Sequence, residues 1–252
     1  MENRKKRKEI TIWAIIFWGI VWHIGSLAIN SSMILVSPTK VAETLVLLIV
    51  SPQFWEITIF SFIRISGGFF LGILMGCILA AVSERFIFIK QLICPIVFAV
   101  KSVPVASFII LALLWFSSEN LSVFISFLMV FPIIYTNVCK GIEETDIKLL
   151  EMADVFEITG IKRIGYIYIP EILPFFRAGC SLAIGLCWKS GIAAEVIGIP
   201  KGSIGEQLQQ SKVYLETSEL FAWTVVIVIV SLLFEKVFLW LIDTVATIWE
   251  RM

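Results

Sequence analysis

The segment Gly141–Glu171 reads GIEETDIKLLEMADVFEITGIKRIGYIYIPE and lies between two long apolar runs. Its first half, Asp146–Phe156, has the apolar stripe of a short helix. Thr159-Gly160 predicts a break. A second short helix is expected over Ile161–Ile169, ending at Pro170. We interpret the segment as a water-facing knob of two short helices that is able to enter a groove on another protein.

The composition around this segment is that of a membrane protein. Hydrophobic residues make up 59% of the 252 residues, and charged residues make up 16%, below the roughly 25% of soluble domains. Apolar stretches near the length of about 20 residues needed to cross a bilayer recur along the chain. The predicted fold class is therefore an all-α integral membrane protein with six spans: Ile10–Ile29, Ile57–Val82, Leu92–Phe116, Leu121–Cys139, Ile172–Ile199 and Leu220–Ile242.

The distribution of basic residues predicts the orientation. Six spans place both termini on one side, and most basic residues lie on that side, including five within residues 4–8. The opposite side holds only Lys40, Lys201 and Lys212. Because cytoplasmic segments carry the excess of Lys and Arg, the termini and residues 141–171 are expected in the cytoplasm. We divide the chain into a basic cytoplasmic N-terminus, residues 1–9, and one transmembrane domain, residues 10–252.

The spacing within the polar segment resembles the Glu-Ala-Ala loop of ABC-importer permeases, written EAA-x3-G-x9-I-x-L-P. Met152 and Ile169 replace an Ala and the Leu of that pattern, and Glu157 occupies the position of the loop glycine. Glu is much less at ease than Gly at positive φ, so this departure puts the turn geometry in question. The resemblance implies docking on an ATPase subunit through these residues: Glu151, Met152, Ala153, Glu157, Gly160, Ile167, Ile169 and Pro170.

The resemblance extends over most of the chain. Ser61-x-x-Arg64, Lys101-x-x-Pro104 and KSGIAAEVIG at 189–198 are similar to permease subunits of nitrate/sulfonate/taurine-type ABC importers. This implies a six-helix type I importer fold with a coupling-helix loop, in a bacterial cytoplasmic membrane. It also implies a homodimer, two cytoplasmic ATPase subunits that bind ATP and Mg²⁺, and an extracytoplasmic binding protein that delivers a small anionic solute. Relatives that handle thiamine precursors, riboflavin or bicarbonate leave the solute open.

Charged side chains within the spans are candidates for the translocation pathway, because a charge in the bilayer usually faces a cavity or a partner. We predict that Lys189 and Lys101 favour an anionic solute, and we include Glu195 in the same pathway. Glu195 follows Lys189 by six residues, so the two point to different sides of their helix. Pairing of Lys189 with Glu195 or Glu235 on a neighbouring helix, or snorkelling at a span end, is the alternative. Pro95 and Pro104 should each bend or break the third span, which would then line the pathway or pack centrally.

Small residues predict close helix packing in the second span. Gly68, Gly72 and Gly76 share one helix face, where a second helix can approach closely. That face is expected to pack within the subunit or at a subunit interface. On the outer side, a helix capped by Ser37 and the stretch Gly202–Glu219 are candidates for the surface on which the delivery protein docks. Interfacial helices are the alternative.

Several function classes find no support in the sequence. There is no phosphate-binding loop of the G-x-x-x-x-G-K-[ST] type, so ATP is expected only on a partner. A net charge of zero gives no basic surface for nucleic acid. One histidine and five cysteines without a CxxC pair predict neither a catalytic nor a metal site. An ion-gradient-driven carrier remains a less favoured alternative, since no internal repeat is evident.

Overall fold

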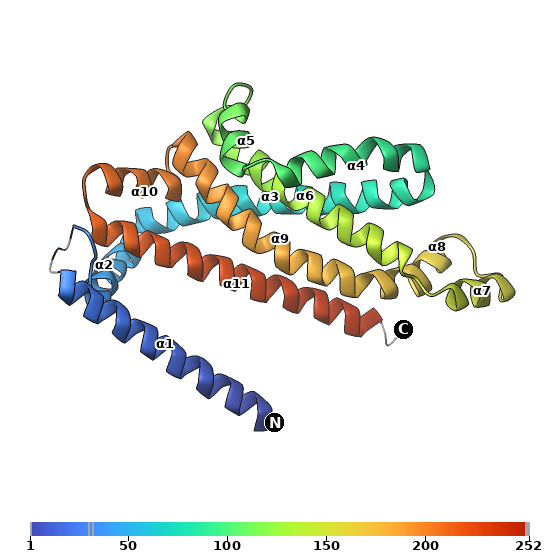
Figure 1. The fold of residues 1–252 in the computed structure, drawn as a ribbon, viewed down its shortest axis with the longest axis horizontal. Coiled ribbons are helices and arrows are strands. Elements are labelled where there is room, and N and C mark those ends of the chain that lie inside the picture. Colours follow the sequence, from blue (N-terminus) through green and yellow to red (C-terminus); the bar gives the residue numbers. More distant parts are fainter. Residues whose placement is uncertain (1, 30, 32, 250–252) are drawn as a thin grey trace.

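The computed structural model describes residues 2–29, 31 and 33–249, with side chains described throughout except at 2–12, 15, 248 and 249. The basic N-terminus predicted over residues 1–9 therefore lies outside the described side chains. Figure 1 shows helices throughout, and the part of the chain described contains no strand. The helices are α1 (Glu2–Ile29), α2 (Pro38–Val50), α3 (Pro52–Arg85), α4 (Ile87–Ser102), α5 (Val105–Ala112), α6 (Ser118–Glu143), α7 (Ile147–Val155), α8 (Gly160–Arg163), the π-helix η1 (Ile164–Tyr168), α9 (Ile169–Gly198), α10 (Ile204–Val213) and α11 (Thr217–Trp249).

Four helical segments within the described residues are long and apolar enough to cross a membrane on their own: Pro52–Arg85, Ser118–Glu143, Gly160–Gly198 and Thr217–Thr247. They correspond to the second, fourth, fifth and sixth predicted spans. The first predicted span falls within α1, whose described apolar part, Ile16–Ile29, is shorter than a span. In Figure 1, α3, α6, α9 and α11 extend along the length of the molecule, with α2 and α10 at one end and α7 and α8 at the other.

The third predicted span, Leu92–Phe116, is not one straight helix. It consists of α4 and α5, which bend by 106° at Val103-Pro104. The residue before a proline is pushed out of the helical region, and Val103 has φ −87° and ψ 136°. Pro95, by contrast, lies inside α4 without ending it. The bend predicted at Pro104 is confirmed, and α4 does not break at Pro95.

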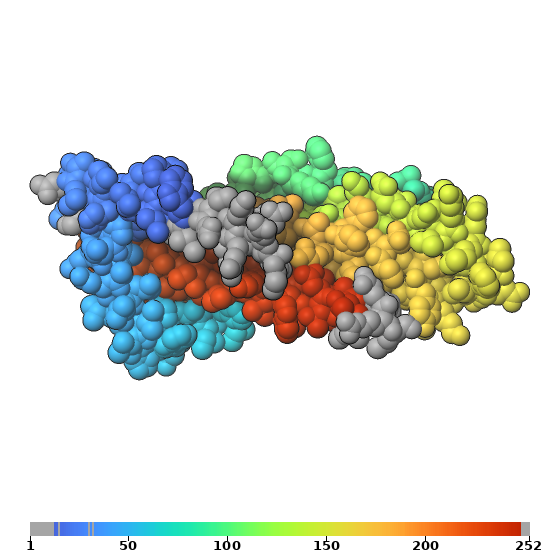
Figure 2. Space-filling model, turned by 90° about the horizontal axis from the view of Figure 1, so that it is seen from below, coloured from blue at the N-terminus to red at the C-terminus, as the bar shows by residue number. Residues whose placement is uncertain are grey.

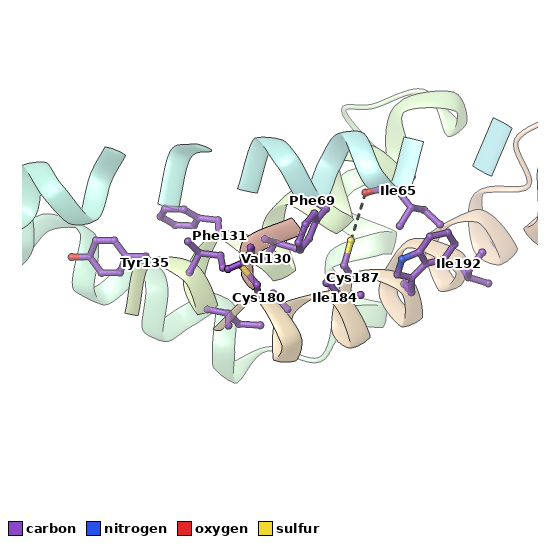
Figure 3. Close-up of a cluster of buried hydrophobic side chains, with 14 of the residues drawn as sticks. Ile65, Phe69, Val130, Phe131, Tyr135, Cys180, Ile184, Cys187 and Ile192 are labelled. Carbon is purple, nitrogen blue, oxygen red and sulfur yellow. Dashed lines mark hydrogen bonds between the residues drawn. The ribbon is translucent and has the colours of Figure 1, made fainter. Parts of the chain in front are cut away.

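The core lies where α3, α6 and α9 meet, and Figure 3 shows side chains from these helices interdigitating there. The glycines of α3 bring its backbone against α6. A methyl group on Gly72 would lie 2.6 Å from Cβ of Val130, and one on Gly76 would lie 2.9 Å from Cβ of Ile134. Gly68 similarly faces the carbonyl of Val123. The glycine face therefore packs inside this subunit, as membrane helices pack when small residues allow it.

Hydrogen bonds fix the start of α2 at the end of the molecule opposite α7. Ser37 accepts a hydrogen bond from the amide of Lys40 at 3.4 Å, and Pro38 stands in the first turn of α2. This confirms the helix start predicted there. Trp22 of α1 donates its indole N–H to the carbonyl of Val36 at 3.0 Å, which links α1 to the segment before α2.

Candidate functional site

The polar segment between α6 and α9 forms one end of the molecule. Asp146 caps α7 by accepting the amide of Lys148 at 2.9 Å, and α7 ends at Val155. This confirms the first predicted helix. Figure 2 shows the yellow-green and yellow atoms of this segment at the end opposite α2. We call residues 146–163 the α7–α8 knob.

The turn after α7 has the geometry that a glycine usually provides. The amide of Ile158 donates to the carbonyl of Ala153 at 2.8 Å, and the amide of Glu157 donates to that of Asp154 at 3.2 Å. These two bonds define a Schellman motif, in which the residue after the C-cap is left-handed. Glu157 has φ 53° and fills that position. The replacement of the loop glycine therefore leaves the turn intact but places a side chain in a strained backbone conformation.

The second predicted helix ends elsewhere than expected. Gly160, at φ 60°, precedes a single α-helical turn, which continues through the π-helical residues Ile164–Tyr168 into α9. Pro170 does not end the helix; it stands in the first turn of α9, where the absence of an N–H is tolerated. The expectation of a separate helix ending at Pro170 is therefore wrong. An ion pair of 2.6 Å between Arg163 and Asp154 links the two halves of the knob.

Exposed apolar side chains concentrate on the knob. Ile147 and Phe156 are each 70% exposed, Val155 is 79% exposed and Ile161 is 88% exposed. Two residues of the matched motif, Ala153 and Ile167, are buried; the other six, Glu151, Met152, Glu157, Gly160, Ile169 and Pro170, are exposed. Exposed apolar side chains gathered on a polar segment are typical of interaction sites, which makes the knob a candidate site.

The knob is mounted on the two helices of the core. α6 leads into it and α9 leads out, and the two helices pack along most of their length. They also touch next to the knob, where a methyl group on Gly141 would lie 3.0 Å from Cα of Ile172. The packed α6–α9 pair therefore connects the knob to the core.

The three charged pathway candidates lie in different surroundings. Glu195 of α9 is fully buried, and its Oε2 accepts from Ser61 Oγ at 2.8 Å and from the amide of Gly205 at 3.3 Å. Ser61 in turn accepts from the amide of Ile204 at 2.9 Å. This carboxylate joins α3, α9 and the start of α10. Its side chain does not line any described groove, so the pathway role predicted for it stays a prediction.

Lys189 is exposed and lies on another side of α9 from Glu195, as their spacing predicted. It forms no ion pair with any described residue, and Glu235 accepts from Ser181 at 2.7 Å. Lys101, at the end of α4, lines a groove of about 470 Å³ between α4 and α6, and its ammonium group donates to Thr136 Oγ1 at 2.7 Å. Lys101 and Lys189 are thus not brought together within this groove.

The sequence did not reveal several polar contacts that the tertiary structure makes. Lys90 bonds Glu84 at 2.7 Å and Glu143 at 2.5 Å, which fastens the start of α4 to the ends of α3 and α6. Arg177 makes a double hydrogen bond with Asp243 between α9 and α11. The only sequence signal for these pairs was a charge near a span end, which does not identify the partner. No group of metal-binding side chains occurs among the described residues.

Comparison of the sequence with known proteins places the chain in a family. The sequence model of the family described as binding-protein-dependent transport system inner membrane component matches residues 68–247. The putative aliphatic sulfonates transport permease protein SsuC of Bacillus subtilis is 28% identical over 222 residues, covering 86% of this chain and 79% of the relative. The taurine transport system permease protein TauC of Escherichia coli is 23% identical over 233 residues, covering 90% and 81%. The nitrate import permease protein NrtB of Synechococcus elongatus is 26% identical over 135 residues, covering 53% and 48%.

Proposed function

Since the chain belongs to the family of binding-protein-dependent transport system inner membrane components, we propose that it forms the membrane pathway of an ATP-driven importer for a small anion. The named solutes of its relatives are aliphatic sulfonates, taurine and nitrate. Each of these carries an oxyanion group, and the ammonium groups of Lys101 and Lys189, which form no ion pair among the described residues, agree with such a solute. The chain itself performs no catalysis in this proposal.

The proposed assembly contains two copies of this chain in the cytoplasmic membrane, with both termini in the cytoplasm. Two ATPase subunits bind ATP and Mg²⁺ on the inner face. An external binding protein delivers the solute at the end formed by α2 and α10. The distribution of Lys and Arg supports this orientation, because it assigns the α7–α8 knob to the cytoplasm.

The observation that carries the proposal is the exposed apolar surface of the α7–α8 knob. Outside the hydrocarbon, such a surface is stabilised when a partner covers it. A groove on the ATPase subunit is the occupant in our proposal. Closure of the two ATPase subunits would then displace the knob. The packed α6–α9 pair would carry that displacement toward the opposite end of the bundle, where Glu195 joins α9 to α3 and α10.

Substitution of Val155 tests this assignment. Val155→Asp leaves the core intact, because the side chain is 79% exposed, but places a charge in the proposed contact. Removing one central apolar anchor of an interface typically costs on the order of 2 kcal/mol, so co-purification of the ATPase subunit should fall by about tenfold or more. Val213→Asp is the matched control, since Val213 is an exposed valine at the opposite end, in α10. Retention of the ATPase by Val155→Asp at the level of the control would refute docking through the knob.

A further inference from the structure

The groove between α4 and α6 has different charge at its two ends. The end nearer the α7–α8 knob is lined by Lys90 and Glu143, and the far end is lined by Lys101 and Thr136. Lys90 and Lys101 are separated by eleven residues of one helix, so the ends lie about 16 Å apart. That distance is close to half of the roughly 30 Å hydrocarbon layer. The groove therefore leads from the membrane surface toward its centre.

The positive charge at the surface end is already neutralised. Lys90 bonds two carboxylates, Glu84 and Glu143, and a further acidic side chain, Glu144, lines the same end of the groove. Lys140 also lines this end, so its charges approximately cancel. An anion gains little by staying there.

The ammonium group at the inner end is not neutralised. Among the described residues, no carboxylate oxygen lies within 4.0 Å of Lys101, and its one hydrogen bond is to Thr136. Thr136 uses its own proton to bond the carbonyl of Pro132 at 2.6 Å, so it accepts from Lys101. An ammonium group has three protons, and two remain free for a ligand. A charge at this depth without a counter-ion is costly unless it faces a cavity that a partner enters.

Tyr135 of α6 also lines the groove, but it does not belong to the inner end. Its hydroxyl interacts with Ser83 and Cys139, and Cys139 in turn lies near Glu84 and Lys90. The unpaired charge at the inner end is therefore that of Lys101.

We propose that the inner end of the α4–α6 groove binds the singly charged oxyanion group of the transported solute. This inference rests on the proposed function as an importer of small anions. Lys101 supplies the charge and two hydrogen-bond donors. The acidic side chains at the surface end repel an anion, so the anion is favoured at Lys101 rather than at Lys90.

Cys94 is a reporter that the chain itself provides. It is exposed, it lines the groove, and it lies two helical turns from Lys101 on the same face of α4. The experiment uses the complete permease–ATPase complex in phosphatidylcholine vesicles. It measures the rate at which Cys94 reacts with anionic sulfonatoethyl methanethiosulfonate, divided by its rate with the cationic trimethylammonioethyl reagent. The charge of Lys101, about 10 Å away along the helix, should raise this anion-to-cation ratio by about tenfold.

Lys101→Gln should lower that ratio by about tenfold, Lys101→Arg should retain it, and Lys148→Gln, which removes an exposed charge on α7, should leave it unchanged. Ethanesulfonate should slow the anionic reagent in the parent and not in Lys101→Gln. An unchanged ratio in Lys101→Gln would overturn the inference. Protection by phosphatidylglycerol in place of ethanesulfonate would also overturn it, by assigning the site to a lipid headgroup. Absence of ATP-dependent ethanesulfonate, taurine and nitrate uptake by the parent complex would instead contradict the proposed function.

Discussion

The left-handed residue after α7 allows a stability prediction with a defined sign. Glu157 has φ 53°, a conformation that costs a side-chain-bearing residue roughly 1–2 kcal/mol and costs glycine almost nothing. Glycine loses more conformational freedom on folding, which removes part of this gain. We therefore expect Glu157→Gly to stabilise the turn by about 1 kcal/mol.

Hydrogen exchange at the amide of Ile158 measures this effect directly. That amide bonds the carbonyl of Ala153 at 2.8 Å and is exchangeable only when the turn opens. A stabilisation of about 1 kcal/mol corresponds to an exchange rate about fivefold slower.

Gly160→Ala is the matched control, because Gly160 has φ 60° with open space around it. Gly160→Ala should accelerate amide exchange in the turn around residue 160, because alanine is strained at this positive φ although its methyl group has room. Faster or unchanged exchange at Ile158 in Glu157→Gly would refute the argument that this turn is strained by its side chain.

Two further predictions concern the core, and both are measured as thermal unfolding in detergent micelles. Gly72→Ala should destabilise the chain by about 1–3 kcal/mol, because its methyl group would lie 2.6 Å from Val130. The control Gly67→Ala, which has nothing within 4 Å, should be neutral or slightly stabilising. Equal effects of the two substitutions would contradict the close approach of α3 and α6. Glu195→Ala should destabilise the chain by about 2–3 kcal/mol, because it leaves Ser61 and the amide of Gly205 without their acceptor. Glu195→Gln should be destabilised much less, because its amide oxygen accepts the same two hydrogen bonds. An unchanged stability of Glu195→Ala would show that the carboxylate does not hold α10.

The periodic and local features of the chain could be predicted from its sequence. The apolar runs predicted α3, α6, α9 and α11, and the caps at Ser37 and Asp146 marked the starts of α2 and α7. These features depend on residues a few positions apart, where helix geometry fixes the contacts. The same reasoning placed Lys189 and Glu195 on different sides of α9.

The partners of the buried and paired groups were decided only by the tertiary structure. Glu195 meets Ser61 across 134 residues of sequence, and Lys101 meets Thr136 across 35. Helical periodicity tells which residues share a face but not which helix that face meets. The sequence likewise predicted a bend or break at both Pro95 and Pro104, because both remove a backbone hydrogen bond, and only the structure shows that the 106° bend lies at Val103-Pro104.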